Sequence, residues 1–300
     1  MSNFFRVLCA VLSVPTVSVF ATACGSDSTA SGAGSVTVQL TDAPFAFDSV
    51  ASVNVFVVRV DARTASTDSA SAAAASDMSG WTTIASPNAS FDLLTLSGGK
   101  TTNLGTSALA TGTYNGFRLI LDTDKSNVVL KNGTKPAVKW PSAGQTGLKI
   151  NLDAPIAVTK DSSVIILDFD VGRSFVMRGN SISQNGLLFK PTIRAIASSA
   201  TGNLSGSVHG DATNGPIVAN ATVEVLKAGS ALSDTVSADV VRSGKTDASG
   251  NFALNFLLPG SYVLRATPPA GSIYKPAVLP TGITIASGAT LSGQVIVLGR

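Results

Sequence analysis

Two aspartates in an apolar run, Asp168 and Asp170, have the type and spacing that point most directly to chemistry in this sequence. In a β-strand they would project from the same face, because side chains two positions apart share a face. Neighbouring carboxylates repel each other, and burial raises the cost of keeping both charged. The pair therefore needs solvent, a basic side chain or a metal ion, and Asp42, Lys190 and Arg194 are the candidate neighbours.

Three arrangements would satisfy these carboxylates. The one we favour is a structural ion-pair network that includes Lys190 or Arg194. The second is a calcium site with oxygen ligands from Asp42, Asp168 and Asp170, in which Ca²⁺ would be a structural cofactor. In the third, the carboxylates are solvated or cap turns.

The inventory of catalytic side chains is small, so we expect that the protein is not an enzyme. His209 is the only histidine, whereas an ordinary zinc site uses two or three. Ser97 and Lys100 have Ser-x-x-Lys spacing, but the supporting Ser-Asp-Asn and Lys-Thr-Gly patches are absent. The run Gly98-Gly-Lys-Thr101 ends like a phosphate-binding loop, but Leu94 stands where the first glycine would be.

The elements that must position these residues are β-strands. Apolar residues recur at every second position in residues 35–41, 117–121 and 165–169, which predicts strands. Residues 52–60 are apolar on both faces at their centre, which predicts a central strand. Asn185-Gly186 lies between strand-like runs and is a strong hairpin signal.

A second block of short strand-like runs begins near residue 202. Turn residues separate these runs, which indicates a β-sandwich, and the runs are 204–208, 221–225, 252–256, 262–266 and 295–297. No long helical stripe occurs. The sequence therefore predicts an all-β protein with two β-sandwich domains in tandem, at residues 35–198 and 202–300.

The N-terminus has the layout of a secretory signal. Met1–Ala23 has one positive side chain, Arg6, then an apolar centre and small residues at its end. The last four residues, Ala21-Thr-Ala-Cys24, resemble the lipobox of bacterial lipoproteins, which usually has Leu where this sequence has Ala21. An ordinary signal peptide and an uncleaved anchor are the alternatives.

The lipobox resemblance implies a membrane anchor at Cys24. It implies cleavage before Cys24, a diacylglycerol on its sulfur and an acyl chain such as palmitate on its new amino group. Several buried chains give stable anchoring where one alone is marginal. Residues 24–34 are rich in Gly and Ser and would form a flexible tether. Gly25 follows the cysteine where lipoproteins of the inner membrane often have Asp, which favours the outer membrane.

Cysteine usage and charge exclude several classes of protein. The cysteines are Cys9, which leaves with the signal, and Cys24, which is committed to lipid, so we expect no disulfide. The chain has 21 Lys and Arg against 18 Asp and Glu, without basic runs. This weak surplus argues against nucleic acid as a partner.

The first block resembles the bacterial domain-of-unknown-function family 4382. The resemblance covers about residues 35–197 and implies a secreted or lipid-anchored protein without an established reaction. It depends on an ordered set of patches: Leu40-Thr-Asp-Ala-Pro44, Phe91-Asp-Leu-Leu-Thr-Leu96, Gly112-Thr-Tyr-Asn-Gly-Phe-Arg-Leu119, Gly147-Leu-Lys-Ile150, Leu167-Asp-Phe-Asp170 and Leu188-Phe-Lys-Pro-Thr-Ile-Arg194.

The second block resembles the carboxypeptidase regulatory-like, transthyretin-type β-sandwich. The matching residues are Gly244-Lys-Thr-Asp-Ala-Ser-Gly-Asn-Phe252 and Leu258-Pro-Gly-Ser-Tyr262. Asp247 and Gly250 would make a turn, and Phe252 would enter the core. The resemblance implies a non-catalytic accessory domain.

These features predict a non-catalytic, lipid-anchored cell-envelope protein with a binding or structural role. Its partners would be the membrane, through the anchor, and envelope proteins or polysaccharide. A carbohydrate-binding module is the alternative, with Trp81, Trp140 and Tyr114 as aromatic candidates, although aromatic residues in β-domains more often pack in the core or at edges. A hydrolase that uses Asp168 and Asp170 is the weaker alternative, because neighbours on one strand face do not span a cleft.

Overall fold

The computed structural model describes most of residues 32–300, which form one compact unit. The described residues are 32–43, 49–64, 80–97, 99–141, 143, 146–152, 154–230, 240–279 and 281–300. The predicted signal, Cys24 and most of the predicted tether lie outside the described residues.

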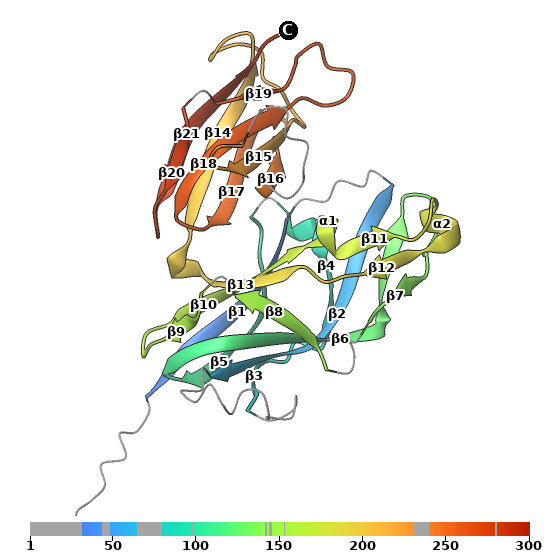
Figure 1. The fold of residues 1–300 in the computed structure, drawn as a ribbon, viewed down its shortest axis with the longest axis vertical. Helices are drawn as coiled ribbons and strands as arrows, with labels where there is room; N and C mark the ends of the chain where they lie inside the picture. Colours follow the sequence, from blue (N-terminus) through green and yellow to red (C-terminus); the bar gives the residue numbers. More distant parts are fainter. Residues whose placement is uncertain are drawn as a thin grey trace, which may run out of the picture. The chain divides into compact units, whose positions relative to one another are not determined.

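Ten strands form one sheet in the first part of the chain (Figure 1). Their order is β3-β2-β6-β8-β13-β10-β1-β5, with β4 paired to β2 and β9 paired to β6. The bounds are β1 (Ala33–Ala43), β2 (Val50–Thr64), β3 (Thr82–Ala85), β4 (Ala89–Asp92), β5 (Thr102–Ala110), β6 (Gly112–Leu130), β8 (Leu148–Leu152), β9 (Ile156–Val158), β10 (Ser163–Asp170) and β13 (Ile193–Ala197).

This sheet curls around an apolar core. Its two end strands approach each other, and Ser107 Oγ of β5 donates a hydrogen bond to the Ile84 carbonyl of β3 at 2.9 Å. The alternating residues Val36, Val38 and Leu40 of β1 are buried in the core, as period two requires. The predicted central strand is confirmed, since β2 lies between β3 and β6.

A smaller sheet of three strands, in the order β11-β12-β7, closes part of the same core. Its strands are β7 (Val138–Lys139), β11 (Phe175–Met177) and β12 (Leu187–Phe189). Phe175 and Phe189 are buried with ring centroids 5.1 Å apart, and Trp140 packs on both rings. The inner face of the small sheet is therefore an aromatic layer.

Two further sheets enclose a second apolar core. One has the order β17-β14-β21, and the other has the order β16-β15-β18-β19 with β20 also paired to β18. The bounds are β14 (Gly202–Gly210), β15 (Thr222–Lys227), β16 (Val240–Lys245), β17 (Asn251–Leu257), β18 (Gly260–Thr267), β19 (Ala277–Val278), β20 (Ile283–Ile285) and β21 (Thr290–Leu298). Val208, Val223 and Leu264 are among the fully buried residues between them, which gives a β-sandwich.

The prediction of an all-β fold is confirmed. The helical segments are single turns: η1 (Leu93–Leu96), α1 (Val171–Ser174), α2 (Ile182–Asn185) and η2 (Ser198–Ala200). None of the helices in the described residues is long and apolar enough to cross a membrane. The two cores share no residue, but the exact division at residues 198–202 stays a prediction.

Two predicted turns can be compared with the structure. At Asp247–Gly250 the prediction is confirmed: the Asp247 carboxylate accepts from the amides of Ser249 and Asn251, and Gly250 has φ +74°. Asn185-Gly186 does connect the antiparallel strands β11 and β12, but it ends α2 and is not a two-residue hairpin loop. Ser181 caps this short helix, which explains why a helical turn replaces the tight loop.

A tyrosine corner repeats in the two cores. Tyr114 donates its hydroxyl to the Ala110 carbonyl at 2.9 Å, and Tyr262 donates to the Leu258 carbonyl at 2.7 Å. In each case the tyrosine follows a glycine by two residues, and these glycines have φ +155° and +158°. Such corners brace the chain where it enters a strand.

Candidate functional site

The candidate site is an ion-pair network around Asp168. Asp168 lies on β10, and it points to the face opposite Leu167 and Phe169, which are in the first core. It is nevertheless only 5% exposed. A buried carboxylate needs partners, because an uncompensated buried charge is costly.

The first partner comes from the neighbouring strand. Arg194 of β13 is paired directly with Asp168 in the sheet register. Its Nε donates to Asp168 Oδ2 at 2.8 Å. The sequence prediction of an ion pair with Arg194 is therefore confirmed, whereas Lys190 is exposed and forms no ion pair among the described residues.

The second partner, Arg242, comes from β16 of the sandwich. Its Nη1 donates to Asp168 Oδ1 and its Nη2 to Asp168 Oδ2, both at 2.9 Å. This two-pronged geometry is the strongest form of arginine–carboxylate pairing. The Arg242 side chain is 3% exposed, so the contact is shielded from water on both sides. Arg242 was not predicted as a partner, because 74 residues separate it from Asp168 and no local signal marks it in the sequence.

Two weaker contacts accompany the Asp168–Arg242 pair. Arg173 of α1 donates from Nη2 to the Val240 carbonyl at 2.7 Å. Asn255 Nδ2 of β17 lies 3.5 Å from the Gly99 carbonyl. Together these contacts join α1 and Gly99 to strands β16 and β17 of the sandwich.

The charge of Asp168 is stabilised by its partners. Burial acts to raise its pKa, but Arg242 and Arg194 outweigh burial, and the pKa is held below its ordinary value. Both carboxylate oxygens are taken by arginine nitrogens. Asp168 is therefore an ionised structural group and a poor proton donor.

Asp42 and Asp170 have the opposite electrostatics. Asp42 is 1% exposed; its Oδ1 accepts from the Val171 amide at 3.0 Å, and its Oδ2 has no partner among the described residues. Burial raises its pKa well above the ordinary value, and Asp168 and Asp170 add to that. Burial also raises the pKa of Asp170, although Asp170 caps α1 by accepting from the Arg173 amide.

The structure does not bring the three aspartates into one ligand set. Asp168 pairs with Thr41 in the parallel register of β1 and β10, and Asp42 pairs with Phe169. Paired residues share a face, so Asp42 and Asp168 point to opposite faces. The described residues contain no group of three or more His, Cys, Asp or Glu that could hold a metal ion. The calcium site stays a prediction.

A second buried carboxylate, Asp61, has a local network. Arg118 Nε donates to Asp61 Oδ2 at 2.8 Å from the directly paired position on β6, and Arg59 Nε contacts Asp61 Oδ1 at 3.2 Å. Burial acts to raise the pKa of Asp61, but the hydrogen bonds from Arg118 and Thr83 and the charge of Arg59 lower it. This network remains within the ten-stranded sheet.

The aromatic candidates for sugar binding have packing roles. Trp81 lies against two guanidinium groups, with Arg118 4.6 Å and Arg63 4.9 Å from its ring centroid. Trp140 belongs to the aromatic layer, and Tyr114 is buried at its corner. The structure does not group these three rings on one exposed surface, which agrees with the packing interpretation.

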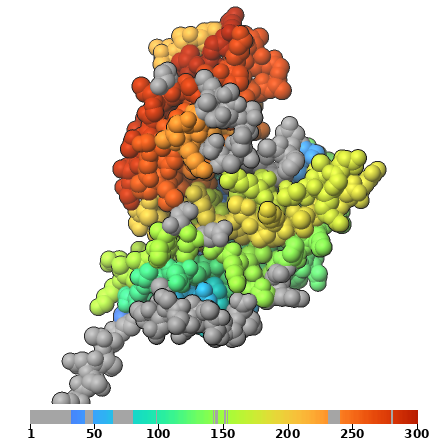
Figure 2. Space-filling model, in the orientation of Figure 1, coloured from blue at the N-terminus to red at the C-terminus, as the bar shows by residue number. Residues whose placement is uncertain are grey.

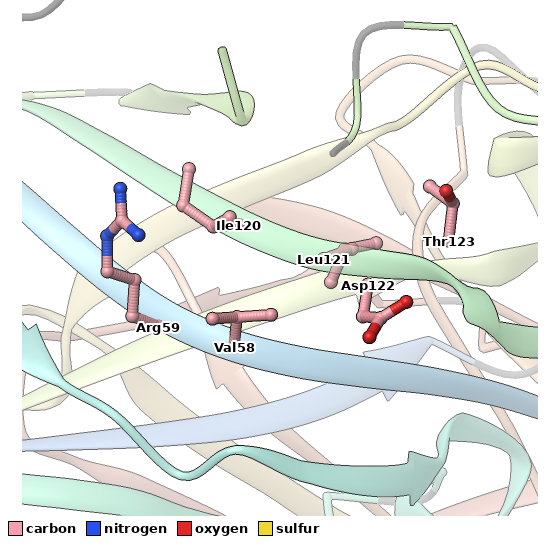
Figure 3. Close-up of a pocket in the computed structure, with 6 residues that line it drawn as sticks. All are labelled: Val58, Arg59, Ile120, Leu121, Asp122 and Thr123. Carbon is pink, nitrogen blue, oxygen red and sulfur yellow. The ribbon is translucent and has the colours of Figure 1, made fainter. Parts of the chain in front are cut away.

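Two other features could have carried chemistry. An open depression of about 380 Å³ is lined by Val58 and Arg59 of β2 and by Ile120, Leu121, Asp122 and Thr123 of β6 (Figure 3). The carboxylate of Asp122 is already paired with Lys125 at 2.9 Å. His209 lies 3.0 Å from both Ser207 Oγ and the Gly215 carbonyl.

These observations define an all-β protein with a curled ten-stranded sheet, a sandwich and a buried structural ion-pair network. The chain belongs to the family described as a domain of unknown function, DUF4382, whose model matches residues 33–191. No curated protein matches the sequence.

Solved structures with distant likeness include two pilins. The Bacillus anthracis TIE protein is 12% identical with a TM-score of 0.26; the match covers 90% of this chain but only 34% of that protein. The minor pilin GBS52 of Streptococcus agalactiae is 13% identical over 88% of this chain and 95% of its own, with a TM-score of 0.26. The shaft pilin spaA of Lactobacillus rhamnosus GG is 11% identical over 89% and 98%, with a TM-score of 0.24. Likeness at this level carries no argument about function.

Proposed function

We propose that this chain is a non-catalytic protein of the cell envelope, anchored to a membrane by lipid on Cys24, with a binding or structural role. The observation that supports it best is the environment of Asp168. This carboxylate was the leading candidate for chemistry, and two arginines occupy both of its oxygens in a nearly water-free position. Such a group holds structure together and cannot exchange protons readily.

The N-terminal sequence supports the anchor. A charged start, an apolar centre and Ala21-Thr-Ala-Cys24 resemble a lipoprotein signal. The sandwich that contains Asp247, Phe252 and Tyr262 resembles an accessory domain of the carboxypeptidase regulatory-like type, which is consistent with a role without catalysis. The outer membrane is the expected location, because Gly25 follows the cysteine.

Membrane fractionation of cells that express the full chain tests the anchor. After a high-salt wash, which removes proteins held to membranes by charge alone, we expect wild type and Cys9→Ala in the membrane fraction and Cys24→Ala in the soluble fraction. Cys9→Ala is the matched control, since it removes a cysteine that lies inside the predicted signal and carries no lipid. If Cys24→Ala fractionates as the wild type does, the anchor is wrong.

The absence of catalysis has its own test. Wild type and Asp168→Asn, both checked for folding by circular dichroism, are assayed on a panel of glycoside and ester substrates. We expect no turnover by either protein. Turnover by the wild type that Asp168→Asn abolishes would overturn the structural role of this carboxylate.

A further inference from the structure

The small sheet β11-β12-β7 and its flanking turns form a basic surface. Residues 131–140 and 171–190 contain six of the 21 Lys and Arg residues of the chain and none of its 18 Asp and Glu residues. These segments are far apart in sequence, and the pairing of β7 with β12 and of β12 with β11 brings them together (Figure 1). Their charge is concentrated on a part of a chain whose net charge is only +3.

The outer face of this sheet is defined by the strand register. Val176 of β11, Leu188 of β12 and Lys139 of β7 form one row across the sheet. They point away from the aromatic layer, because Phe175 and Phe189 occupy the alternate positions. Arg178 and Lys190 directly follow β11 and β12, and both are exposed.

Most of these cations have no internal partner. Lys131, Lys135, Lys139, Arg178 and Lys190 are exposed and form no ion pair with any residue that the structure describes. The buried networks of Asp61 and Asp168, by contrast, use arginines that are paired directly to carboxylates. The five cations are therefore available to an external anion.

Exposed apolar side chains lie beside the cations. Val176, in the outer row, is 45% exposed, and Met177, at the next and oppositely facing position of β11, is 40% exposed; they are two of the four large hydrophobic residues that are exposed among the described residues. Apolar groups next to basic ones are characteristic of surfaces that rest on a membrane, where cations meet headgroups and apolar groups enter the boundary. A soluble polyanion would need only the charge.

We propose that the outer face of β11-β12-β7 docks on the headgroups of anionic phospholipids. The inference deepens the proposed function, and it depends on the anchor to bring the membrane within reach. Eight residue steps lead from Cys24 to Gly32, and an extended chain spans at most about 3.6 Å per step, so the tether reaches no farther than roughly 30 Å. An anchor at Cys24 would keep the protein near the bilayer, and the attraction of the basic face for the headgroups acts within about 8 Å of the surface at physiological salt.

Vesicle sedimentation tests this docking without any lipid on the protein. The full chain with Cys24→Ala is mixed with vesicles of phosphatidylglycerol and phosphatidylcholine or of phosphatidylcholine alone. Each basic residue near an anionic surface contributes about fivefold in affinity. The further changes Lys139→Gln, Arg178→Gln and Lys190→Gln should therefore weaken binding to the anionic vesicles about 100-fold.

A matched control distinguishes the effect of the position of the charges on the basic face from the effect of total charge. Lys160→Gln, Lys245→Gln and Lys275→Gln remove the same charge from exposed positions elsewhere, and should leave binding within about threefold of the parent. Any contribution of the apolar N-terminal run is common to all three proteins. Added salt should weaken binding of the parent and control alike.

Several results would overturn the proposal: equal losses in the two triple variants, equal binding to both kinds of vesicle, or binding to soluble dextran sulfate with none to vesicles. The last result would indicate a soluble polyanion as the ligand. Because the vesicle experiment uses an unlipidated chain, its outcome is independent of the fractionation of Cys24→Ala. Failure of the docking face and failure of the anchor are thus distinguishable.

Discussion

Asp61 and Asp168 are both buried aspartates held by two arginines, but their networks differ in reach. Asp61 takes its arginines from two residues away, at Arg59, and from the neighbouring strand, at Arg118. Asp168 takes Arg194 from the neighbouring strand, but Arg242 comes from a sheet that encloses the other core. The first network therefore stabilises one sheet, and the second couples two cores.

The difference shows how one kind of interaction has two structural consequences. The energy of a buried pair depends on geometry and desolvation, and Asp168 has a two-pronged pair with the 3% exposed Arg242, whereas Arg59 beside Asp61 is 38% exposed. What an ion pair connects depends only on where its partners lie in the fold. Arg118 also has the ring of Trp81 against its guanidinium, whereas Arg242 Nε has no partner among the described residues. Arg242 thus depends more heavily on its aspartate.

The largest expected effect is that of Asp168→Ala. It leaves Arg242 buried without its carboxylate, and breaking a buried pair costs about 3–5 kcal/mol in the free energy of unfolding. We expect Asp61→Ala to fall at the lower end, about 3 kcal/mol, because Trp81 remains against Arg118. Urea unfolding should split into two transitions for Asp168→Ala and remain a single transition for Asp61→Ala.

Asp161→Ala is the control for both changes. Asp161 is exposed and forms no ion pair among the described residues, so its loss should alter the free energy by less than about 0.5 kcal/mol. A single unfolding transition in Asp168→Ala, with a loss no larger than that of Asp161→Ala, would show that the pair does not couple the cores.

The pH dependence should separate Asp168 from Asp42. The pKa of Asp168 is lowered in the fold, so its contribution is present above the unfolded pKa of about 3.9 and is lost as pH falls through the folded value. The pKa of Asp42 is raised in the fold, so its contribution to stability is present below the unfolded pKa and is lost as pH rises through the folded value.

Asp42→Asn tests the expected direction of the pH dependence of Asp42. The variant cannot ionise, so at pH 7 it should be more stable than the wild type by on the order of 1 kcal/mol, and the difference should vanish below about pH 4. Urea unfolding from pH 3 to pH 8 measures it. A variant that is less stable than the wild type at pH 7 would show that the ionised carboxylate of Asp42 is satisfied in the fold.

The smallest expected effects come from the two tyrosine corners. Tyr114→Phe and Tyr262→Phe each remove one hydrogen bond to a carbonyl, which costs about 1 kcal/mol. In an Asp168→Ala background, each change should lower the unfolding temperature of the core that contains the tyrosine and leave that of the other core unchanged. Thermal unfolding followed by calorimetry measures this, and an equal effect of either change on both transitions would contradict the separation of the cores.

Much of the fold could be predicted because strands carry a local signal. The period-two pattern placed β1, β2, β6 and β10 and the strands of the sandwich, and the chemistry of Asp247 and Gly250 predicted their turn. Arg194 was predicted only as one of two candidate basic partners of Asp168, together with Lys190. The Asn185-Gly186 prediction was only partly right, because the cap at Ser181 favoured a helical turn.

The distant contacts could not be predicted. The period-two pattern predicts which face of a strand a residue occupies, but it does not predict which sheet covers that face. The pairing of the strands makes Arg242 the partner of Asp168 and places Asp42 on the opposite face from Asp168. The basic face arose in the same way, because Lys139, Arg178 and Lys190 are brought together by β7, β11 and β12.

Residue order alone predicted the all-β class, the strand positions, the need of Asp168 for a basic side chain, a metal ion or solvent, and lipid at Cys24. Those features depend on periodicity, composition and short motifs, which act over a few residues. The tertiary structure decided which arginine couples the cores and which cations share a surface. Such choices depend on long-range pairing, where packing and burial outweigh any local preference.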